Sequence, residues 1–342
     1  MKCYQCGNED ERYFAYDKGV YYCRKCVAFG RMDAYERKES CHLSTRVIEV
    51  SPQLKYELTD KQKAISHKIV GYLKQKKDVF VYAATGAGKT ESVFECICFY
   101  LSQGKKVGFA ISRRQVVLEI AQRLRQAFPT LHVVEVTQGY TTITDGDIIV
   151  CTMHQLYRYP DGFDLLIMDE VDAFPYVGND VLQTITRRAC KGQRVLLSAT
   201  PDEESLQKIK QKEMEMVTLF ERPHKHPLVV PKVYECNLFF QVLMIIGCCY
   251  SWIRQSKQVL VFVPRRQDCI WLNTILKLFF RSSMIHSQTK EKDEILDQFR
   301  QIRRTGLYDT FRKRYHGTKR AGNCMPGRSC GIYQCKLDSN IW

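Results

Sequence analysis

Residues 83–90, with the sequence AATGAGKT, decide the fold of this 342-residue chain. They follow a short apolar run and precede a segment that reads as helix, which is the strand–loop–helix order of a phosphate-binding loop. The glycines aim backbone N–H groups at phosphates, the lysine supplies a cation, and the threonine offers a hydroxyl to Mg²⁺. Ala83 replaces the usual first glycine, and a fortuitous Gly-rich turn is the alternative. The residues expected to bind ATP and Mg²⁺ in this loop are Thr85, Gly86, Ala87, Gly88, Lys89 and Thr90.

Apolar runs alternate with helical patterns on both sides of this loop. Because each run is apolar throughout, the pattern predicts an α/β fold, a parallel sheet with helices on both faces. Ligands of such a sheet bind at the carboxyl ends of its strands. Strands are expected at 79–82, 106–111, 132–136, 147–152, 163–168 and 194–197, and helices at 115–128 and from residue 154.

Two carboxylates follow the buried run 163–168. Asp169 is expected to hold Mg²⁺, and Glu170 to orient or deprotonate the water that attacks the γ-phosphate. Ordinary pKa values would keep both carboxyl groups ionised at neutral pH. Together with Lys89 upstream, they form the predicted catalytic set.

Two Cys-x2-Cys pairs lie near the N-terminus, Cys3 with Cys6 and Cys23 with Cys26. Each pair points two thiolates at one centre, and a hairpin between the pairs can bring them together. Four thiolates would close a Zn²⁺ site that holds a fold too small to bury enough apolar surface alone. An iron–sulfur cluster and redox thiols are the alternatives. Cys41 is treated as surplus, since four ligands are already present.

This cysteine head also carries aromatic side chains interleaved with Lys and Arg, namely Tyr4, Tyr13, Phe14, Tyr16, Tyr21 and Tyr22. Aromatic rings beside Lys and Arg can form a stacking platform for single-stranded bases. The same rings can be the core of a very small domain, and the sequence leaves both interpretations open.

Charge and hydropathy indicate the kind of partner and the compartment of the protein. The formal net charge of +15 favours a polyanionic partner such as nucleic acid or a membrane surface. The polar N-terminus shows no secretory signal, so the 16 cysteines are expected in the reducing cytosol. The longest apolar stretch, 238–253, is shorter than the roughly 20 residues that cross a bilayer, so a buried helix is expected and no integral membrane segment is predicted.

In this order and spacing, AATGAGKT, DEVD at 169–172 and SAT at 198–200 resemble motifs I, II and III of the superfamily 2 DEAD/DEAH-like helicases. The run FDLLIMDEVDAFPY at 163–176, behind a four-cysteine head, is similar to the ComFA family of late competence proteins. The resemblance implies recA-like domains and a DNA-dependent ATPase at the inner face of the membrane that drives uptake of single-stranded DNA. It also implies the ComFC protein and the ComEC membrane channel as partners, and a cytoplasmic location, peripheral to that membrane.

The resemblance assigns roles to further residues. Gln62 matches the glutamine that reads the adenine edge, although a surface glutamine in a first helical turn fits its position equally. Ser198 and Thr200 would couple the state of the γ-phosphate to the neighbouring domain, and a capping pair before a helix is the alternative.

Three residues fall at segments that contact DNA in that family: Arg113, Thr152 and Arg265. A solvated cation at a helix start is the alternative for Arg113. Arg114 beside it is the weaker candidate.

A second α/β lobe is expected after a Pro-rich linker that holds His224 and His226. Its expected strands are at 258–263 and 284–286, and its expected helices at 238–254, 269–280 and 290–300. The Gln-x-x-Gly-Arg-x-x-Arg motif that supplies an arginine finger in the family is not found in the sequence.

The stretch 302–342 is basic and has neither a strand-length apolar run nor a helical period. A basic extension that binds DNA or anionic lipid is one interpretation, and a metal site from Cys324, Cys330 and Cys335 is a second. A shift of reading frame near Gln301 is favoured, because the family pattern stops in mid-domain.

The predicted organisation is a zinc-binding head at 1–50, a recA-like ATP-binding domain at 51–220, a linker at 221–232, an incomplete second recA-like domain at 233–301 and a tail at 302–342. The favoured function is an ATP-dependent translocase of single-stranded DNA for uptake in natural competence. A remnant that binds ATP and DNA without efficient turnover is one alternative, and a DNA repair or replication-restart helicase is another.

Overall fold

The alternating pattern produces a sheet of seven strands in the computed structural model, in the order β5-β6-β4-β7-β8-β3-β9. Every neighbouring pair in this sheet runs parallel, which confirms the predicted α/β fold. The structure describes residues 2–29, 33–34, 40–173, 175–223, 232–286, 288–291, 294–295 and 298–299. The strands are β3 (Asp78–Ala83), β4 (Val107–Ile111), β5 (Val133–Val136), β6 (Ile148–Thr152), β7 (Phe163–Asp169), β8 (Cys190–Ser198) and β9 (Met214–Leu219).

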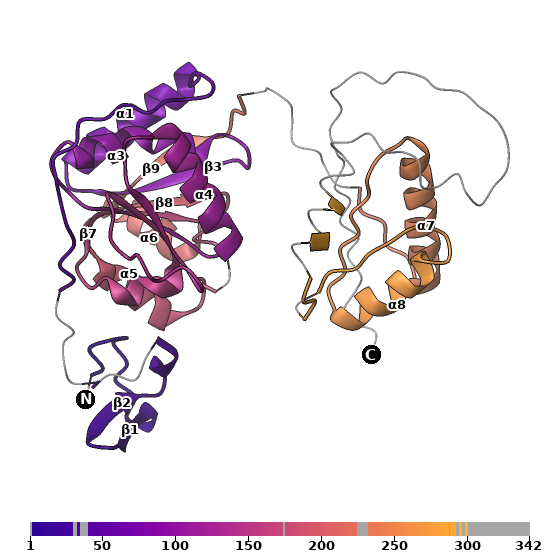
Figure 1. Cartoon of the computed structure of the whole chain (residues 1–342), viewed down its shortest axis with the longest axis horizontal. Coiled ribbons are helices and arrows are strands. Elements are labelled where there is room, and N and C mark those ends of the chain that lie inside the picture. The colour runs from indigo at the N-terminus through magenta and orange to yellow at the C-terminus, as the bar shows by residue number, and fades with distance from the viewer. Residues whose placement is uncertain are drawn as a thin grey trace. The chain divides into compact units, whose positions relative to one another are not determined.

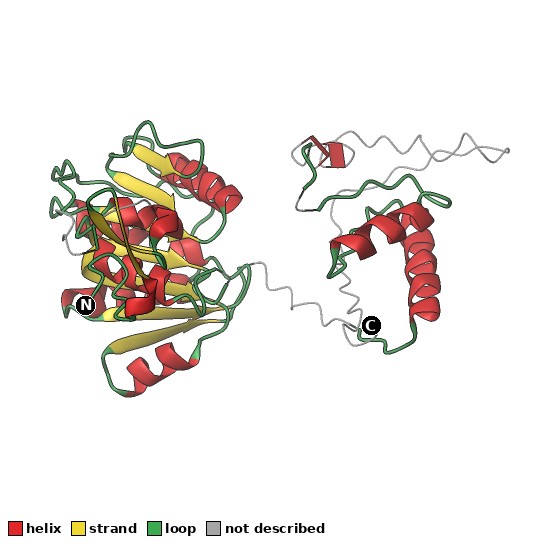
Figure 2. Ribbon diagram, turned by 90° about the horizontal axis from the view of Figure 1, so that it is seen from below, coloured by secondary structure: helices red, strands yellow, loops and turns green. Residues whose placement is uncertain are grey.

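Helices cover both faces of this sheet, because successive strand residues point to opposite sides (Figure 1 and Figure 2). Val79 and Val81 of β3 pack in a cluster with α1, α3 and α4, whereas Phe80 packs in a cluster with α5 and the 3₁₀ helix η3. The sequence patterns did not reveal α5, α6 or β9. The helices are α1 (Asp60–Lys74), α2 (Lys89–Ser92), α3 (Phe94–Leu101), α4 (Arg114–Ala127), η3 (Met153–Arg158), α5 (Asp180–Ala189) and α6 (Glu203–Lys210).

Helix α1 begins at a capping box. The side chain of Thr59 accepts a hydrogen bond from the Gln62 N–H, and the side chain of Gln62 accepts one from the Thr59 N–H. These two bonds satisfy backbone donors that have no partner at a helix start. The cap is therefore Thr59, and it fixes the position of Gln62.

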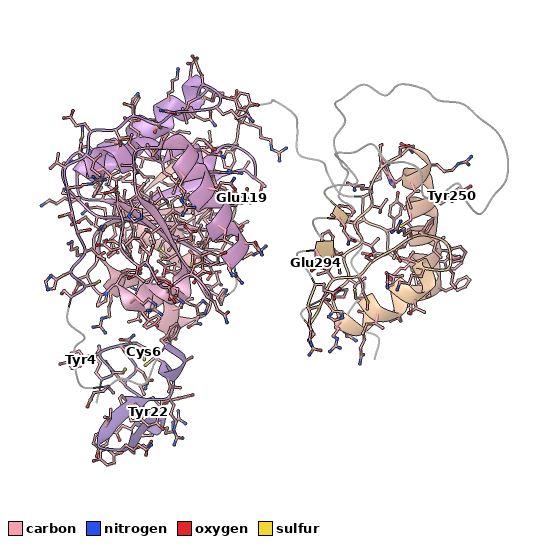
Figure 3. All side chains as sticks on the ribbon, viewed as in Figure 1. Tyr4, Cys6, Tyr22, Glu119, Tyr250 and Glu294 are labelled. Atoms are coloured by element: carbon pink, nitrogen blue, oxygen red, sulfur yellow. The ribbon has the colours of Figure 1, made fainter. Side chains whose placement is uncertain are left out.

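The N-terminal head is built on a hairpin of β1 (Phe14–Asp17) and β2 (Val20–Cys23), with short 3₁₀ helices η1 (Glu11–Tyr13) and η2 (Val27–Phe29). Lys18 and Gly19 turn it with positive φ values of 51° and 81°, which match the right-handed twist of the strands. Figure 3 marks Cys6 and two of the tyrosines in this head.

The head tyrosines do not form its core. Tyr16 is 61% exposed, and its ring lies 4.6 Å from that of Tyr21 on the outside of the hairpin. The core is made instead by the four cysteines, with Phe14 packed against them. The interpretation of the head aromatics as a domain core therefore holds for Phe14 and is wrong for the exposed tyrosines Tyr4, Tyr13, Tyr16 and Tyr21.

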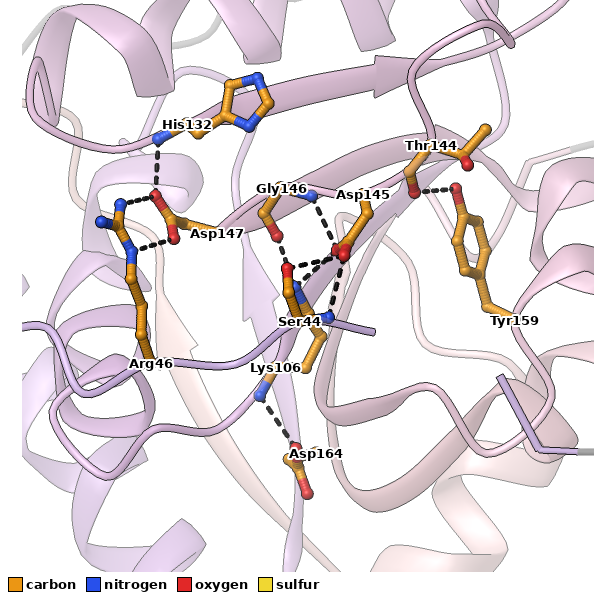
Figure 4. Close-up of polar contacts among 10 residues, drawn as sticks. All are labelled: Ser44, Arg46, Lys106, His132, Thr144, Asp145, Gly146, Asp147, Tyr159 and Asp164. Atoms are coloured by element: carbon orange, nitrogen blue, oxygen red, sulfur yellow. Dashed lines mark hydrogen bonds and ion pairs between the residues drawn. The ribbon is translucent and has the colours of Figure 1, made fainter. Parts of the chain in front are cut away.

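A connecting segment, residues 40–54, runs from the head to α1 along the lobe. Ser44 donates through its N–H and its hydroxyl to Asp145, at 2.9 and 2.7 Å, and Arg46 forms a two-pronged ion pair with Asp147 (Figure 4). Beneath them the buried Nζ of Lys106 donates to Asp145 Oδ1 at 2.8 Å and to the Gly146 carbonyl at 2.5 Å. These polar contacts fasten the segment to the loop before β6.

Acid is expected to weaken this attachment as the pH falls from about 4 toward about 2. Burial alone would raise the pKa of Asp145, but hydrogen bonds from Lys106 and Ser44 outweigh burial and lower the pKa to about 2. A carboxyl group with a lowered folded-state pKa stabilises the fold above its unfolded pKa, and this stabilisation is lost as the pH falls through the folded value. Urea midpoints measured between about pH 5 and about pH 2 should therefore fall less steeply in Asp145→Asn than in the wild type.

Glu49→Gln is the matched control, because Glu49 is an exposed carboxylate of the same segment. That variant should follow the wild-type decline. An equal decline in Asp145→Asn and in the wild type would contradict the role assigned to Asp145.

The chain divides into two compact units, Met1–His226 and Pro227–Trp342. The described part of the second unit contains α7 (Leu238–Arg254) and α8 (Arg266–Leu276), which pack through Ile245, Cys249, Leu272 and Leu276. The expected helices 238–254 and 269–280 correspond to them. Of the expected helix 290–300, residues 294–295 and 298–299 are described and helical. The predicted linker histidines and the whole stretch 302–342 lie outside the described residues.

The two strands expected in the second unit are not formed, so those predictions are wrong. Residues 258–263 still alternate as a strand would, with Val259, Val261 and Val263 packed against the helices and Leu260 and Phe262 about half exposed. A strand also needs a neighbour for its backbone hydrogen bonds, and among the described residues neither 258–263 nor 284–286 belongs to a sheet.

Helix α7 is not the buried helix expected from its apolar sequence. It buries Ile245 and Cys249, whereas Phe239, Phe240 and Tyr250 are more than half exposed. Tyr250 is labelled on this helix in Figure 3. Only one side of α7 packs against α8 and residues 259–263, which is why so many apolar side chains are exposed. Among the described helices, none has both the length and the apolar character needed to span a bilayer.

Candidate nucleotide and metal sites

The phosphate loop joins β3 to α2. Gly86 and Gly88 have φ values of 78° and 84°, in the left-handed region that glycine adopts without strain. A Cβ at Gly88 would also collide with the side-chain amide of Gln62. Ala83, where the usual pattern has glycine, is the buried last residue of β3 and needs no special conformation. The loop therefore has the backbone that a phosphate cradle requires.

Gln62 lies against this loop. Its side chain is buried, and Nε2 donates to the Ala87 carbonyl at 2.8 Å. The alternative of a surface glutamine is therefore wrong, because the capping box and the loop hold both ends of the amide. Reading of an adenine edge by Gln62 stays a prediction.

Asp169 and Glu170 stand at the carboxyl end of β7, two strands from β3 in the sheet. Burial raises the pKa of Asp169, and the charge of Lys89 opposes that rise. The expectation of an ordinary pKa for Asp169 is therefore wrong, because burial raises the pKa of this carboxyl group. The buried Asp169 carboxylate and the buried Thr90 hydroxyl are oxygen donors of the kind that Mg²⁺ prefers. Lys89 lies close enough to Asp169 for its charge to act on that carboxyl group.

Glu170 adopts a positive φ of 54°, which is uncommon for a residue with a side chain. Its N–H donates to Asp169 Oδ1 at 2.9 Å. Its buried Oε2 accepts no hydrogen bond within the described part of the chain, and Arg113 Nε lies 3.7 Å away. Such strain and unmet bonding capacity concentrate at functional sites.

The Ser198-Ala199-Thr200 turn is bonded to the acidic turn. Ser198 Oγ accepts from the Thr200 N–H at 2.9 Å, and the Thr200 hydroxyl donates to Asp172. The following helix is capped by Asp202, which accepts from the Ser205 N–H at 2.8 Å. The capping alternative for Ser198 and Thr200 is therefore wrong.

The candidate DNA contacts fall in both units. Arg113 precedes α4 and is 68% exposed, and Thr152 ends β6 beside Ile111 of β4. Arg265 precedes α8 in the second unit. The structure thus brings Arg113 and Thr152 to the ends of two neighbouring strands of one sheet. Arg265 is the N-cap residue of α8, as Arg113 is of α4.

Two contacts at the phosphate loop escaped the sequence analysis. Arg222 Nε donates to the Thr85 carbonyl at 2.8 Å, and the ring of Phe220 meets that of Tyr82 edge to face at 4.8 Å. Arg222 and Thr85 are 137 residues apart, so no local pattern pairs them. The position of Phe220 directly after β9 would have been the signal, had that strand been predicted.

The four head cysteines converge on one point. Their sulfurs lie within 4.8 Å of one another and all four residues are buried. Cys3 Sγ lies 3.7 Å from Cys26 Sγ, and Cys6 Sγ lies 3.7 Å from Cys23 Sγ. Sulfurs about 2.3 Å from a central Zn²⁺ are about 3.8 Å apart in a tetrahedron, so the spacing fits a closed four-thiolate site.

Hydrogen bonds among these thiols shift their pKa values in opposite directions, and that of Cys3 is lowered. Hydrogen bonding with Cys3 and Cys6, together with burial, raises the pKa of the Cys26 thiol. A bound metal ion favours the thiolate and reverses this effect. Cys41 takes no part, since its N–H donates to the Pro160 carbonyl and its side chain packs on the lobe.

The head is docked on the lobe below α5 (Figure 1) and contacts η3. Phe29 stacks on His154 of η3, with ring centroids 5.8 Å apart. Val181 of α5 packs against the cysteine cluster. Burial lowers the pKa of His154. The head and the lobe are therefore one packed unit.

The model of the DEAD/DEAH box helicase family matches residues 59–209 of this chain. The competence protein ComFA of Bacillus subtilis is 32% identical over 321 residues, covering 87% of this chain and 68% of that protein. ComFA of Streptococcus pneumoniae is 30% identical over 318 residues, covering 85% and 70%.

Among solved structures, the DEAD-box helicase Mss116 bound to single-stranded RNA and UDP-BeF superposes with a TM-score of 0.54. It is 18% identical, and the match covers 71% of this chain and 58% of that one, so it supports the fold alone. The chain carries a DEAD/DEAH box helicase domain and belongs to the ComFA family of competence proteins.

Proposed function

We propose that this chain is an ATP-dependent translocase of single-stranded DNA that acts in DNA uptake during natural competence. The observation that carries the proposal is the strand end where the buried Asp169 and the strained Glu170 stand near the phosphate loop. Membership of the ComFA family of competence proteins is the reason for assigning this ATP hydrolysis to DNA uptake.

Each residue of the site has a role in this proposal. The loop N–H groups and Lys89 hold the phosphates of ATP, and Thr90 and Asp169 hold Mg²⁺, which neutralises charge on the transferring phosphate. Glu170 takes a proton from the attacking water as the new oxygen–phosphorus bond forms and ADP leaves. Thr200, which is bonded to Asp172, and Ser198, which is bonded to Thr200, couple the state of the γ-phosphate to the neighbouring domain. Gln62 contacts the adenine edge.

Arg113, Thr152 and Arg265 bind the DNA backbone in this proposal. The cysteine head holds one Zn²⁺ through Cys3, Cys6, Cys23 and Cys26 in a structural role. The proposed location is the inner face of the membrane, with the ComFC protein and the ComEC channel as partners. Co-purification of either partner with the chain from competent cells tests that part.

A second candidate function is binding without efficient turnover. It is favoured by one observation, that the sequence contains no Gln-x-x-Gly-Arg-x-x-Arg motif. Loss of an arginine finger costs about 10³–10⁵ in rate.

Phosphate release by the whole chain, with and without single-stranded DNA, decides between the two candidates. Release that rises on addition of single-stranded DNA, and rises less with duplex DNA, is expected of a single-stranded DNA translocase. Binding of ATP and DNA without any rise in phosphate release would contradict the translocase and support the second candidate.

A further inference from the structure

The ends of β4 and β7 place a surface cation beside the proposed catalytic base. Ile111 of β4 pairs with Asp169 of β7, so the residues that follow each of them leave the sheet side by side. Two residues after Ile111 comes Arg113, and one after Asp169 comes Glu170. Their proximity follows from the register of two neighbouring strands.

Two contacts join these segments. The Ser112 hydroxyl donates to the Glu170 carbonyl at 3.5 Å, and Arg113 Nε lies 3.7 Å from Glu170 Oε2. That carboxylate oxygen is buried and accepts no hydrogen bond from the described residues. The Arg113 side chain is 68% exposed, so the same guanidinium faces Glu170 and the solvent.

The surroundings of Arg113 suit a polyanion. Arg114 lies over the ring of Tyr140 after β5. Two arginines and an exposed tyrosine thus lie near the carboxyl ends of β4 and β5. Cations with neighbouring aromatic rings are the usual surface for a single-stranded nucleic acid.

We propose that Arg113 restrains Glu170 in the DNA-free chain and that a DNA phosphate releases it by taking over the guanidinium. In the restrained state the ion pair holds the carboxylate toward Arg113 and away from the attacking water. A phosphate bound to Arg113 competes for the same cation, so Glu170 becomes free to accept a proton. This inference rests on the proposed function and adds the means by which DNA stimulates ATP hydrolysis. Arg113 is thus a positioning residue that acts through Glu170.

The test is phosphate release by the whole chain without DNA and with saturating single-stranded DNA. Arg113→Ala is expected to raise the DNA-free rate by about two- to fivefold, the range that an exposed ion pair supplies. The ratio of the DNA-stimulated rate to the DNA-free rate should fall toward one. A cation that only contacted DNA would leave the DNA-free rate unchanged.

Arg187→Ala is the matched control, because Arg187 is an exposed arginine in the last turn of α5 and has no part in the proposed ATP or DNA sites. It should change neither the DNA-free rate nor the ratio of the two rates. An unchanged or lower DNA-free rate in Arg113→Ala, beside a wild type that DNA stimulates, would overturn this inference alone. A wild type with no DNA-stimulated release would overturn the proposed translocase and this inference with it.

Discussion

Glu170→Gln is expected to lower DNA-stimulated phosphate release by about 10²–10⁴ while nucleotide affinity stays close to that of the wild type. The amide has the shape of the carboxylate but cannot accept a proton from the attacking water. Glu170 stands at the end of β7, with an Oε2 that accepts no hydrogen bond from the described residues. The substitution also removes the ion pair with Arg113, a loss that would raise the rate and so cannot account for a fall. Steady-state phosphate release and titration with ATP measure the two quantities separately.

Two further variants make this expectation sharp. Lys89→Ala removes the cation of the phosphate loop and should weaken ATP binding as well as turnover. Glu213→Gln makes the same chemical change at an exposed carboxylate after α6 and should behave as the wild type. If Glu170→Gln kept more than about a tenth of the wild-type rate, Glu170 would not be the base.

The phosphate loop and the central strands could be predicted from the sequence because their signals are local. A run such as 163–168, apolar at nearly every position, has one stable environment, the middle of a parallel sheet covered on both faces. Acidic residues directly after such a run must lie at the sheet edge where the loop also lies. The sequence therefore predicts that Asp169 and Glu170 lie next to the loop.

Contacts between distant segments could not be predicted in this way. Arg222 meets Thr85 because β9 joins the sheet beside β3, and β9 itself was missed. The alternation of its sequence is partial, since Met216 on the outer edge is itself apolar and 38% exposed. The register that sets Arg113 against Glu170 is likewise a property of two strands together, and neither sequence carries it alone.

In the second unit the sequence predicts a strand that the structure does not form. Residues 258–263 have the alternating pattern of a strand, and their valines pack as the inner face of one would. Pattern alone describes which side chains are apolar, whereas a strand is defined by hydrogen bonds to a partner. Without a partner among the described residues, the pattern gives an extended segment and no sheet.

Removal of metal is expected to unfold the N-terminal head while the sheet of the first unit stays folded. The core of the head is the four cysteines themselves, with a two-stranded hairpin that is too small to be stable alone. Structural Zn²⁺ sites contribute about 10–16 kcal/mol of apparent binding free energy in zinc-finger peptides, so the head should depend on its metal for folding. Chelation, or Cys23→Ser, should remove hydrogen-exchange protection from residues 2–29 and leave that of β3 and β7 unchanged.

The position of the head on the lobe gives this expectation a second readout. Phe29 covers His154, and burial lowers the pKa of that histidine. When the head unfolds, His154 becomes exposed and its pKa should rise toward the ordinary value of about 6.5, which NMR titration follows directly. Cys248→Ser on α7 is the matched control, because Cys248 is exposed and outside the cluster. A head that stays protected after metal is removed, with the His154 pKa unchanged, would show that packing against η3 and α5 holds it without metal.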